Sequence, residues 1–208
     1  MNEKENNEIL KENIENLEQE NENKEKPKKS LEHTVVELVS IISSSIVAIM
    51  VIFTFMFRIV GVSGPSMEET LQDGDWLIVS AFITEPERGD IVIITQPNAF
   101  NEPIVKRVIA IEGDTIDIDF ENATVKINGK IINEPYLGSP TSIDEGAWQY
   151  PITLKEGQVF VMGDNRMHSS DSRSPDIGLI EEHYILGQVL MRFSPITEIK
   201  FFGDYDYE

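Results

Sequence analysis

The chain has 208 residues, a formal net charge of -20 at pH 7 and no cysteine. This length predicts one soluble domain with accessory segments. The acidity argues against a nucleic-acid partner, because no basic stripe is present to neutralise phosphates. The lack of cysteine excludes disulfides, thiolate catalysis and cysteine-ligated zinc.

The N-terminal residues 1–30 are rich in Glu, Asn and Lys and hold few large apolar side chains. This composition predicts a cytoplasmic acidic tail, mostly disordered, over residues 1–37. A weak apolar stripe at helical spacing leaves open a short helix that meets a partner. The stripe consists of Ile9, Leu10, Ile14 and Leu17.

An uncharged segment follows from Leu38 to Phe57, between Glu37 and Arg58. At about 1.5 Å per residue, a helix of this length is roughly 30 Å long, which matches one hydrocarbon core. The alternatives are a buried core helix and a cleaved signal peptide. A signal peptide has a shorter apolar region, of about 7 to 15 residues, close to the N-terminus. We therefore predict an uncleaved transmembrane helix over residues 38–58.

Basic residues flank this helix unequally. Four lysines lie close before it, whereas after Arg58 no Lys or Arg occurs until Arg88. The lysines are Lys24, Lys26, Lys28 and Lys29. The positive-inside rule then leaves the N-terminus in the cytoplasm and the residues after the helix outside.

Short β-rich runs separated by turns make up the remainder of the chain, residues 59–208. Asn128-Gly129, between two such runs, is a strong hairpin signal. The pattern predicts an all-β fold with an antiparallel core, and a small β lobe inserted at about residues 112–154. The candidate strands are Trp76–Ser80, Ile91–Thr95, Ile104–Ile111, Thr115–Ile118, Thr124–Ile127, Gln158–Met162 and Gly187–Phe193.

Ser66 lies on a Gly/Pro turn and has two interpretations. Ser66-Met67-Glu68-Glu69 fits a capping box that opens a helical turn, which is the more common role of such a pattern. A serine on an exposed turn is also a candidate nucleophile. The local sequence favours the cap, so evidence for a nucleophile has to come from elsewhere in the chain.

Lys106 supplies that evidence, because it lies in an apolar strand whose two faces are both apolar apart from Lys106 and Arg107. Burial among aliphatic side chains lowers a lysine pKa by several units and makes the neutral amine a usable general base. The alternative is a lysine at a sheet edge whose amine reaches solvent. Ser66 and Lys106 would together form a serine–lysine pair that needs no histidine, metal or cofactor.

The polar run Met162–Arg173 forms either a loose surface loop or an ordered network beside a site. His168 within it suggests a serine–histidine pair, but Ser66 lacks the G-x-S-x-G elbow, since Glu68 stands where the second glycine belongs. No H-x-x-x-H pattern or acidic cluster predicts a metal site.

Several motifs, in order behind the apolar segment, resemble those of the bacterial type I signal peptidases. The similarity extends over nearly all of residues 35–202. The matching segments are SGPSMEETL (63–71), DGDWLIVS (73–80), RGDIVIITQP (88–97), IVKRVIAIEGD (104–114), VKINGKIINEPYL (125–137) and GDNRMHSSDSR (163–173).

The resemblance implies an all-β catalytic core and a membrane-bound serine endopeptidase. It would lie in the bacterial cytoplasmic membrane, with its catalytic domain on the outer face. There it would remove signal peptides from exported preproteins, after small residues at the first and third positions before the cut. Ser66 would attack the scissile carbonyl, Lys106 would be the general base, and the Ser66 amide would bind the oxyanion. Ser169 would orient the lysine, and charged residues would brace the site as ion pairs; these are Asp164, Arg107, Asp171 and Arg173.

Five apolar residues match the shallow substrate pockets of this family, namely Val62, Met67, Leu71, Ile104 and Val105. The expected partners are signal-peptide-bearing preproteins and membrane lipid. Ser66 lies nine positions after Phe57, which is at most about 30 Å of extended chain and keeps the serine near the outer membrane surface.

Two residues depart from the family pattern. Glu69 stands where proline is usual, and a carboxylate near Lys106 would oppose the lowered pKa. Gly64 stands where some members carry an oxyanion-hole serine. Two alternatives remain: a self-cleaving repressor-like protease, which would need a DNA-binding domain, and a membrane-tethered β-domain that binds partners.

Overall fold

The computed structural model describes residues 31–82, 85–203 and 207. The acidic tail predicted for residues 1–37 falls largely outside these residues. The chain divides into two units, residues 1–51 and 52–208, which we describe separately.

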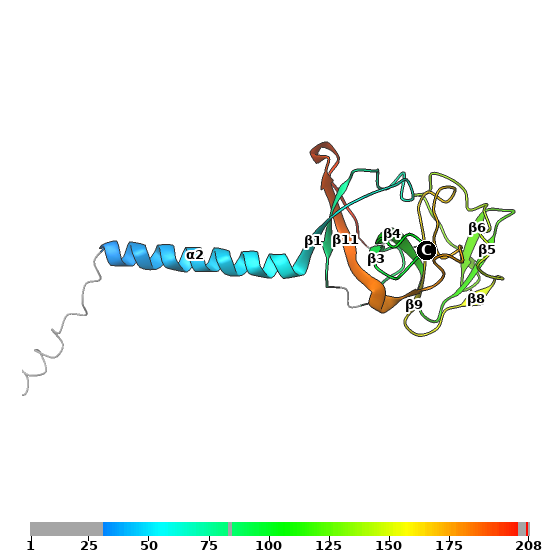
Figure 1. The fold of residues 1–208 in the computed structure, drawn as a ribbon, viewed down its shortest axis with the longest axis horizontal. Coiled ribbons are helices and arrows are strands. Elements are labelled where there is room, and N and C mark those ends of the chain that lie inside the picture. Colours follow the sequence, from blue (N-terminus) through cyan, green and yellow to red (C-terminus); the bar gives the residue numbers. More distant parts are fainter. Residues whose placement is uncertain (1–30, 83–84, 204–206, 208) are drawn as a thin grey trace, which may run out of the picture. The chain divides into compact units, whose positions relative to one another are not determined.

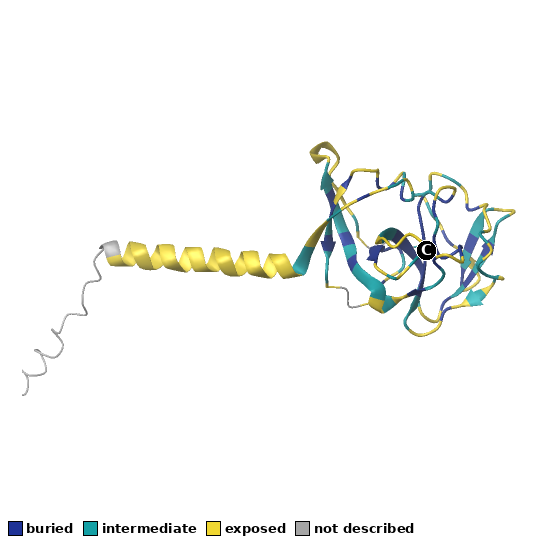
Figure 2. Ribbon diagram, viewed as in Figure 1, coloured by how far each residue is buried: buried dark blue, intermediate teal, exposed yellow. Residues whose placement is uncertain are grey.

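Helix α2 spans Leu31–Met56. Its residues 33–55 are exposed, as the yellow ribbon in Figure 2 shows. The segment His33–Met56 has a mean hydropathy of 2.5, so by length and composition it can cross a membrane. The helix starts earlier than the uncharged segment and also ends earlier than we predicted. Residues 57 and 58 belong instead to a strand, because their backbone pairs with residues 79 and 80.

The larger sheet has eight strands, in the order β1-β2-β11-β3-β4-β9-β10, with β12 beside β11 (Figure 1). All of its pairings are antiparallel. Two short 3-10 helices, η1 (Glu182–Tyr184) and η2 (Ile196–Glu198), flank β11. The strands are β1 (Phe57–Gly61), β2 (Trp76–Ser80), β3 (Ile91–Ile94), β4 (Ile104–Ala110), β9 (Gln158–Met162), β10 (Ile180–Glu181), β11 (Ile185–Ser194) and β12 (Lys200–Phe201).

The smaller sheet has four strands, in the order β7-β6-β5-β8, and falls within the range predicted for the inserted lobe. The hairpin predicted at Asn128-Gly129 is confirmed: it joins β6 to β7, and both turn residues have positive φ, 51° and 80°. Such φ values are those of the tight turns that match strand twist. The strands are β5 (Thr115–Asp119), β6 (Thr124–Ile127), β7 (Lys130–Ile131) and β8 (Ile152–Thr153).

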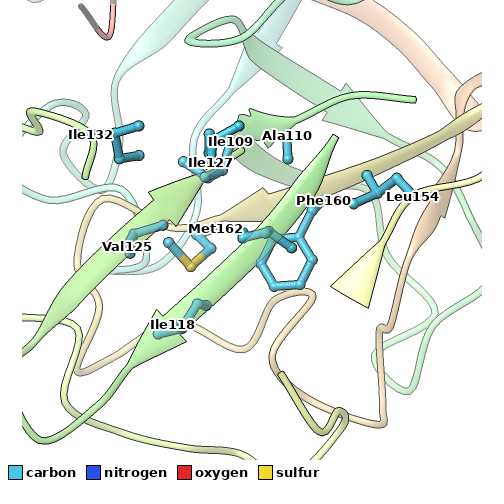
Figure 3. Close-up of a cluster of buried hydrophobic side chains, with 10 residues drawn as sticks. Ile109, Ala110, Ile118, Val125, Ile127, Ile132, Leu154, Phe160 and Met162 are labelled. Atoms are coloured by element: carbon cyan, nitrogen blue, oxygen red, sulfur yellow. The ribbon is translucent and has the colours of Figure 1, made fainter. Parts of the chain in front are cut away.

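A cluster of buried apolar side chains joins the two sheets (Figure 3). Ile109 and Met162 come from the larger sheet, and Ile118 and Val125 from the smaller one. A second cluster, which includes Met67, lies beneath the turn that carries Ser66. The predicted all-β fold with an antiparallel core is confirmed.

Candidate active site

The turn that carries Ser66 lies between β1 and β2 and is held at both ends. The Val62 amide donates to the Asp75 carbonyl at 2.8 Å, and the Gly64 amide donates to Asp73 Oδ1 at 2.9 Å. Met67 is 1% exposed and anchors the turn in the core. The serine is therefore presented by a constrained segment, although it lies outside any helix or strand.

The hydroxyl of Ser66 contacts Lys106 rather than capping a helix. Its Oγ lies 2.8 Å from Lys106 Nζ, which is hydrogen-bond distance. The helical turn that follows is closed by the Leu71 amide, which donates to the Met67 carbonyl at 2.8 Å. It is short, because the chain bends away after Leu71. The structure brings together the two residues singled out from the sequence.

Lys106 is buried at the centre of the larger sheet. It lies on β4, between β3 and β9, and is 3% exposed. A sheet-edge lysine that reaches solvent is therefore the wrong interpretation. Desolvation lowers the pKa of the Lys106 amine to about 8, against a smaller opposing effect of Asp171. The charges of Arg173, Asp164 and Glu145 also act on it.

The segment 163–173 is an ordered network, not a loose loop. Asp171 accepts hydrogen bonds from the Gly163 amide at 2.9 Å, from Ser169 Oγ at 2.8 Å and from Arg173 Nε at 2.9 Å. The Asn165 amide donates to the Ser66 carbonyl at 3.1 Å, so this network also fixes the serine turn.

Ser169 was expected to orient the lysine. Its hydroxyl instead donates to Asp171, and Lys106 makes its side-chain hydrogen bond with Ser66. Ser169 thus holds Asp171, whose charge acts on the Lys106 amine.

The two ion pairs implied by the resemblance are present. Arg107 donates to Asp164 through Nε at 2.8 Å and through Nη2 at 2.6 Å, and Arg173 pairs with Asp171. Arg107 thereby ties β4 to the loop that supports Ser66. These residues lie beside the serine and lysine, as bracing groups would.

A cleft of about 540 Å³ opens over Ser66 and Lys106. Four of the five predicted substrate-binding residues line it: Val62, Met67, Ile104 and Val105. Leu71 does not, because it is 0% exposed and packs in the core cluster behind the turn. The apolar spacing of residues 62–71 gave no signal for which side chains face inward.

The cleft also includes residues that the sequence did not indicate. They lie on β3, in the loop before β4 and in the polar network, and are Ile93, Phe100, Glu102, Pro103 and Ser170. His168, which the sequence suggested as a partner of Ser66, also lines the cleft. His168 Nδ1 lies 3.2 Å from Asn165 Oδ1. No group of three His, Asp or Glu residues suited to a metal ion occurs among the residues that the structure describes.

The two departures from the family pattern have structural explanations. The Glu69 side chain packs on Gly138, where an added Cβ would lie 2.8 Å from Glu69 Cγ. It therefore extends toward the inserted lobe. Gly64 has a φ of 90°, a conformation that disfavours a serine side chain there.

Gly163 offers a test of how tightly the site is packed. A Cβ at this position would lie 2.2 Å from Ser169 Oγ and 2.4 Å from the Ser66 carbonyl oxygen. Because one contact is with backbone, Gly163→Ala must displace the serine turn, and we expect kcat, measured from the rate of product formation, to fall about 100-fold. Gly203→Ala, where an added Cβ meets no atom within 4 Å, is the control. An unchanged kcat in Gly163→Ala would contradict this packing.

These features define a class: an all-β protein with an apolar helix before the β-domain and a cleft in which a serine hydroxyl meets a buried lysine amine. Residues 35–194 match the family model described as signal peptidase, peptidase S26. The chain belongs to this family, whose members cleave signal peptides from preproteins.

Relatives are similar over most of the chain. Signal peptidase I of Bacillus licheniformis is 36% identical, over 81% of this chain and 94% of its own length. Signal peptidase I T of Bacillus subtilis strain 168 is 36% identical, over 84% and 93%. A solved signal peptidase I from Enterococcus faecalis V583 is 30% identical, with a TM-score of 0.42, over 51% of this chain and 98% of that one. The apolar helix and the relatives fit a membrane-anchored peptidase.

Proposed function

We propose that this protein is a membrane-bound serine endopeptidase that removes N-terminal signal peptides from exported preproteins. Ser66 is the nucleophile and Lys106 the general base. The observation that supports this assignment is the 2.8 Å contact between Ser66 Oγ and a lysine that is 3% exposed. A buried, neutral amine within reach of a hydroxyl is the arrangement that general-base catalysis needs.

The reaction begins when neutral Lys106 takes the proton of the Ser66 hydroxyl as Oγ attacks the scissile carbonyl. The oxyanion binds the Ser66 amide, which donates to no other group within the described residues. The Lys106 ammonium then protonates the leaving amine, and the neutral amine activates the water that hydrolyses the acyl-enzyme.

The substrate lies extended in the cleft, between the segment leading to Ser66 and the start of β4. Val62, Met67, Ile104 and Val105 line shallow apolar space there, which suits small residues at the first and third positions before the cut. Helix α2 anchors the protein in the bacterial cytoplasmic membrane, in contact with lipid. Its N-terminus lies in the cytoplasm and the β-domain on the outer face.

The test is cleavage of a preprotein with Ala-x-Ala at its processing site by the full chain in detergent. We expect the wild type to cut after the second alanine, as mass spectrometry of the product would show. Ser66→Ala should abolish cutting, whereas Ser80→Ala, at the end of β2, should retain it. A wild type that binds the preprotein but does not cut it would favour the membrane-tethered binding domain instead.

The pH dependence tests Lys106 as the base. Activity requires the neutral amine, so kcat/KM should rise with pH through an acid limb near the Lys106 pKa of about 8. The Glu145 carboxylate raises the pKa of Lys106, against the larger effect of desolvation. Glu145→Gln should therefore move the limb to lower pH.

Glu69→Gln is the matched control, since the Glu69 side chain packs on Gly138. We expect it to leave the limb in place. A profile that is flat across this range while chemistry limits the rate would rule out the depressed amine. If the limb moved only in Glu69→Gln, the carboxylate that acts on Lys106 would be Glu69 and not Glu145.

A further inference from the structure

Tyr207 is far in sequence from the catalytic residues, yet it contacts the strand that carries Lys106. Its hydroxyl lies 2.9 Å from the Tyr136 hydroxyl and 3.4 Å from the Val108 carbonyl oxygen. Val108 is on β4, two residues after Lys106. The Tyr207 ring also packs against the apolar cluster that joins the two sheets.

The direction of the hydroxyl bonds follows from proton count. The Tyr136 hydroxyl donates its proton to Glu134 Oε1 at 2.9 Å. A phenol has one proton to give, so in the contact between the two tyrosines Tyr207 is the donor. Glu134 in turn pairs with Arg166, whose Nε donates to the Gly163 carbonyl at 3.0 Å.

Tyr136, which Tyr207 holds in place, covers the guanidinium of Arg107. The Arg107 Cζ atom lies 4.0 Å from the centre of the Tyr136 ring. Arg107 binds Asp164 through two hydrogen bonds and the Gly89 carbonyl through a third, at 2.8 Å. An aromatic ring stacked on a desolvated arginine stabilises one orientation of the guanidinium.

The Arg107–Asp164 pair connects the two segments that carry the reacting atoms. Arg107 follows Lys106 on β4, and Asp164 precedes Asn165, whose amide donates to the Ser66 carbonyl at 3.1 Å. The pair therefore connects the lysine strand to the serine turn. A shift of this connection changes the distance between Ser66 Oγ and Lys106 Nζ.

We propose that Tyr207 is a positioning residue of the active site: through Tyr136 and Arg107 it holds the serine turn and the lysine strand at reacting distance. This inference rests on the proposed function. Tyr207 is not among the residues that line the cleft, so it acts on the chemical step and not on substrate binding.

The first experiment separates kcat from KM for the same preprotein, using the full chain in detergent. Tyr207→Phe keeps the ring and removes both hydroxyl contacts. We expect kcat to fall about threefold to tenfold with an unchanged KM, because small displacements of reacting groups affect the chemical step. Tyr207→Ala, which also removes the ring packing, should lower kcat further.

Tyr184→Phe, on η1, is the matched control and should keep the wild-type kcat. Circular dichroism and a melting curve confirm that each variant is folded at the assay temperature. A purely stabilising Tyr207 would lower the melting temperature and leave kcat of the folded enzyme unchanged, and this result would overturn the proposal.

A second measurement does not depend on cleavage. Competitive acetylation followed by mass spectrometry gives the pKa of Lys106 in each variant. Loosening the packing in Tyr207→Ala admits water, so we expect the pKa of Lys106 to rise from about 8 toward its ordinary value. A wild type that does not cut preproteins would count against the proposed function, whereas an unchanged Lys106 pKa in Tyr207→Ala would overturn the role of Tyr207.

Discussion

Replacing Lys106 with methionine is expected to abolish cleavage and, at neutral pH, to stabilise the protein. Removal of the general base should lower kcat by at least about 10³-fold. The amine is 3% exposed and its pKa is lowered from 10.5 to about 8, mainly by desolvation. At 1.36 kcal/mol per unit, holding the charged form in this site costs about 3 kcal/mol, which an apolar side chain of similar length does not incur.

The stability gain should depend on pH in a way that identifies its cause. Below about pH 8 the amine is protonated in both the folded and the unfolded chain, so the full cost is present. Above pH 8 the folded protein loses its proton first, and the wild type becomes more stable until about pH 10.5. The advantage of Lys106→Met should therefore shrink across this range.

Urea unfolding of both proteins in detergent at pH 7 and at pH 10 measures this difference. Lys126→Met is the matched control, because Lys126 forms a partly exposed ion pair with Asp117. It should retain activity and show no comparable gain in the free energy of unfolding. If Lys106→Met were less stable than wild type at pH 7, burial of the charged amine would not cost folding free energy.

The reacting pair was predictable from the sequence because both residues belong to patterns with a physical meaning. A strand with two apolar faces favours burial of its lysine, and the structure places Lys106 in the middle of a sheet. The strands themselves follow from alternating β-branched runs between Gly and Asp turns. The hairpin at Asn128-Gly129 follows from the turn residues alone.

Other features depend on contacts between distant segments and left no local signal. Leu71 and Met67 both pack in the core cluster, and only the packing of the turn decides that Met67 also lines the cleft. The Ser169 hydroxyl donates to Asp171 because the intervening turn brings the two together. The Tyr136–Tyr207 contact joins residues that are 71 positions apart. Phe57 extends the uncharged segment, but pairing with β2 makes both Phe57 and Arg58 part of a strand.

Asp171→Asn is expected to be the most destabilising conservative change near the site. The side chains of Asp171 and Arg173 are both 0% exposed, and Arg173 Nε donates to Asp171 Oδ1 at 2.9 Å. Removing one charge of a buried pair leaves the other uncompensated, at a cost of about 3–5 kcal/mol. The nearest other carboxylate is that of Glu145, 3.5 Å from Arg173 Nη2, which offsets part of this loss.

The pH dependence of this effect has the same sign as that of Lys106, because both groups make the wild type more stable as the pH rises, but it lies in the acid range. Burial alone would raise the pKa of Asp171, but the hydrogen bond and charge of Arg173, together with the hydrogen bonds from Gly163 and Ser169, hold it below the ordinary value of 3.8. The stabilisation is therefore present above about pH 4 and is lost as the pH falls through the folded-state pKa. The difference between wild type and Asp171→Asn should be constant near neutrality and decrease only in acid.

Asp117→Asn provides the surface comparison, since Asp117 and Lys126 are 39% and 33% exposed and lie 3.3 Å apart. We expect it to change the free energy of unfolding by at most about 1 kcal/mol. If urea unfolding at pH 7 gave Asp171→Asn a loss no larger than this, the network would not depend on the buried charge. In that case the Gly163 amide and Ser169 hydroxyl, which an asparagine oxygen can still accept, would be sufficient to hold the segment beside Ser66.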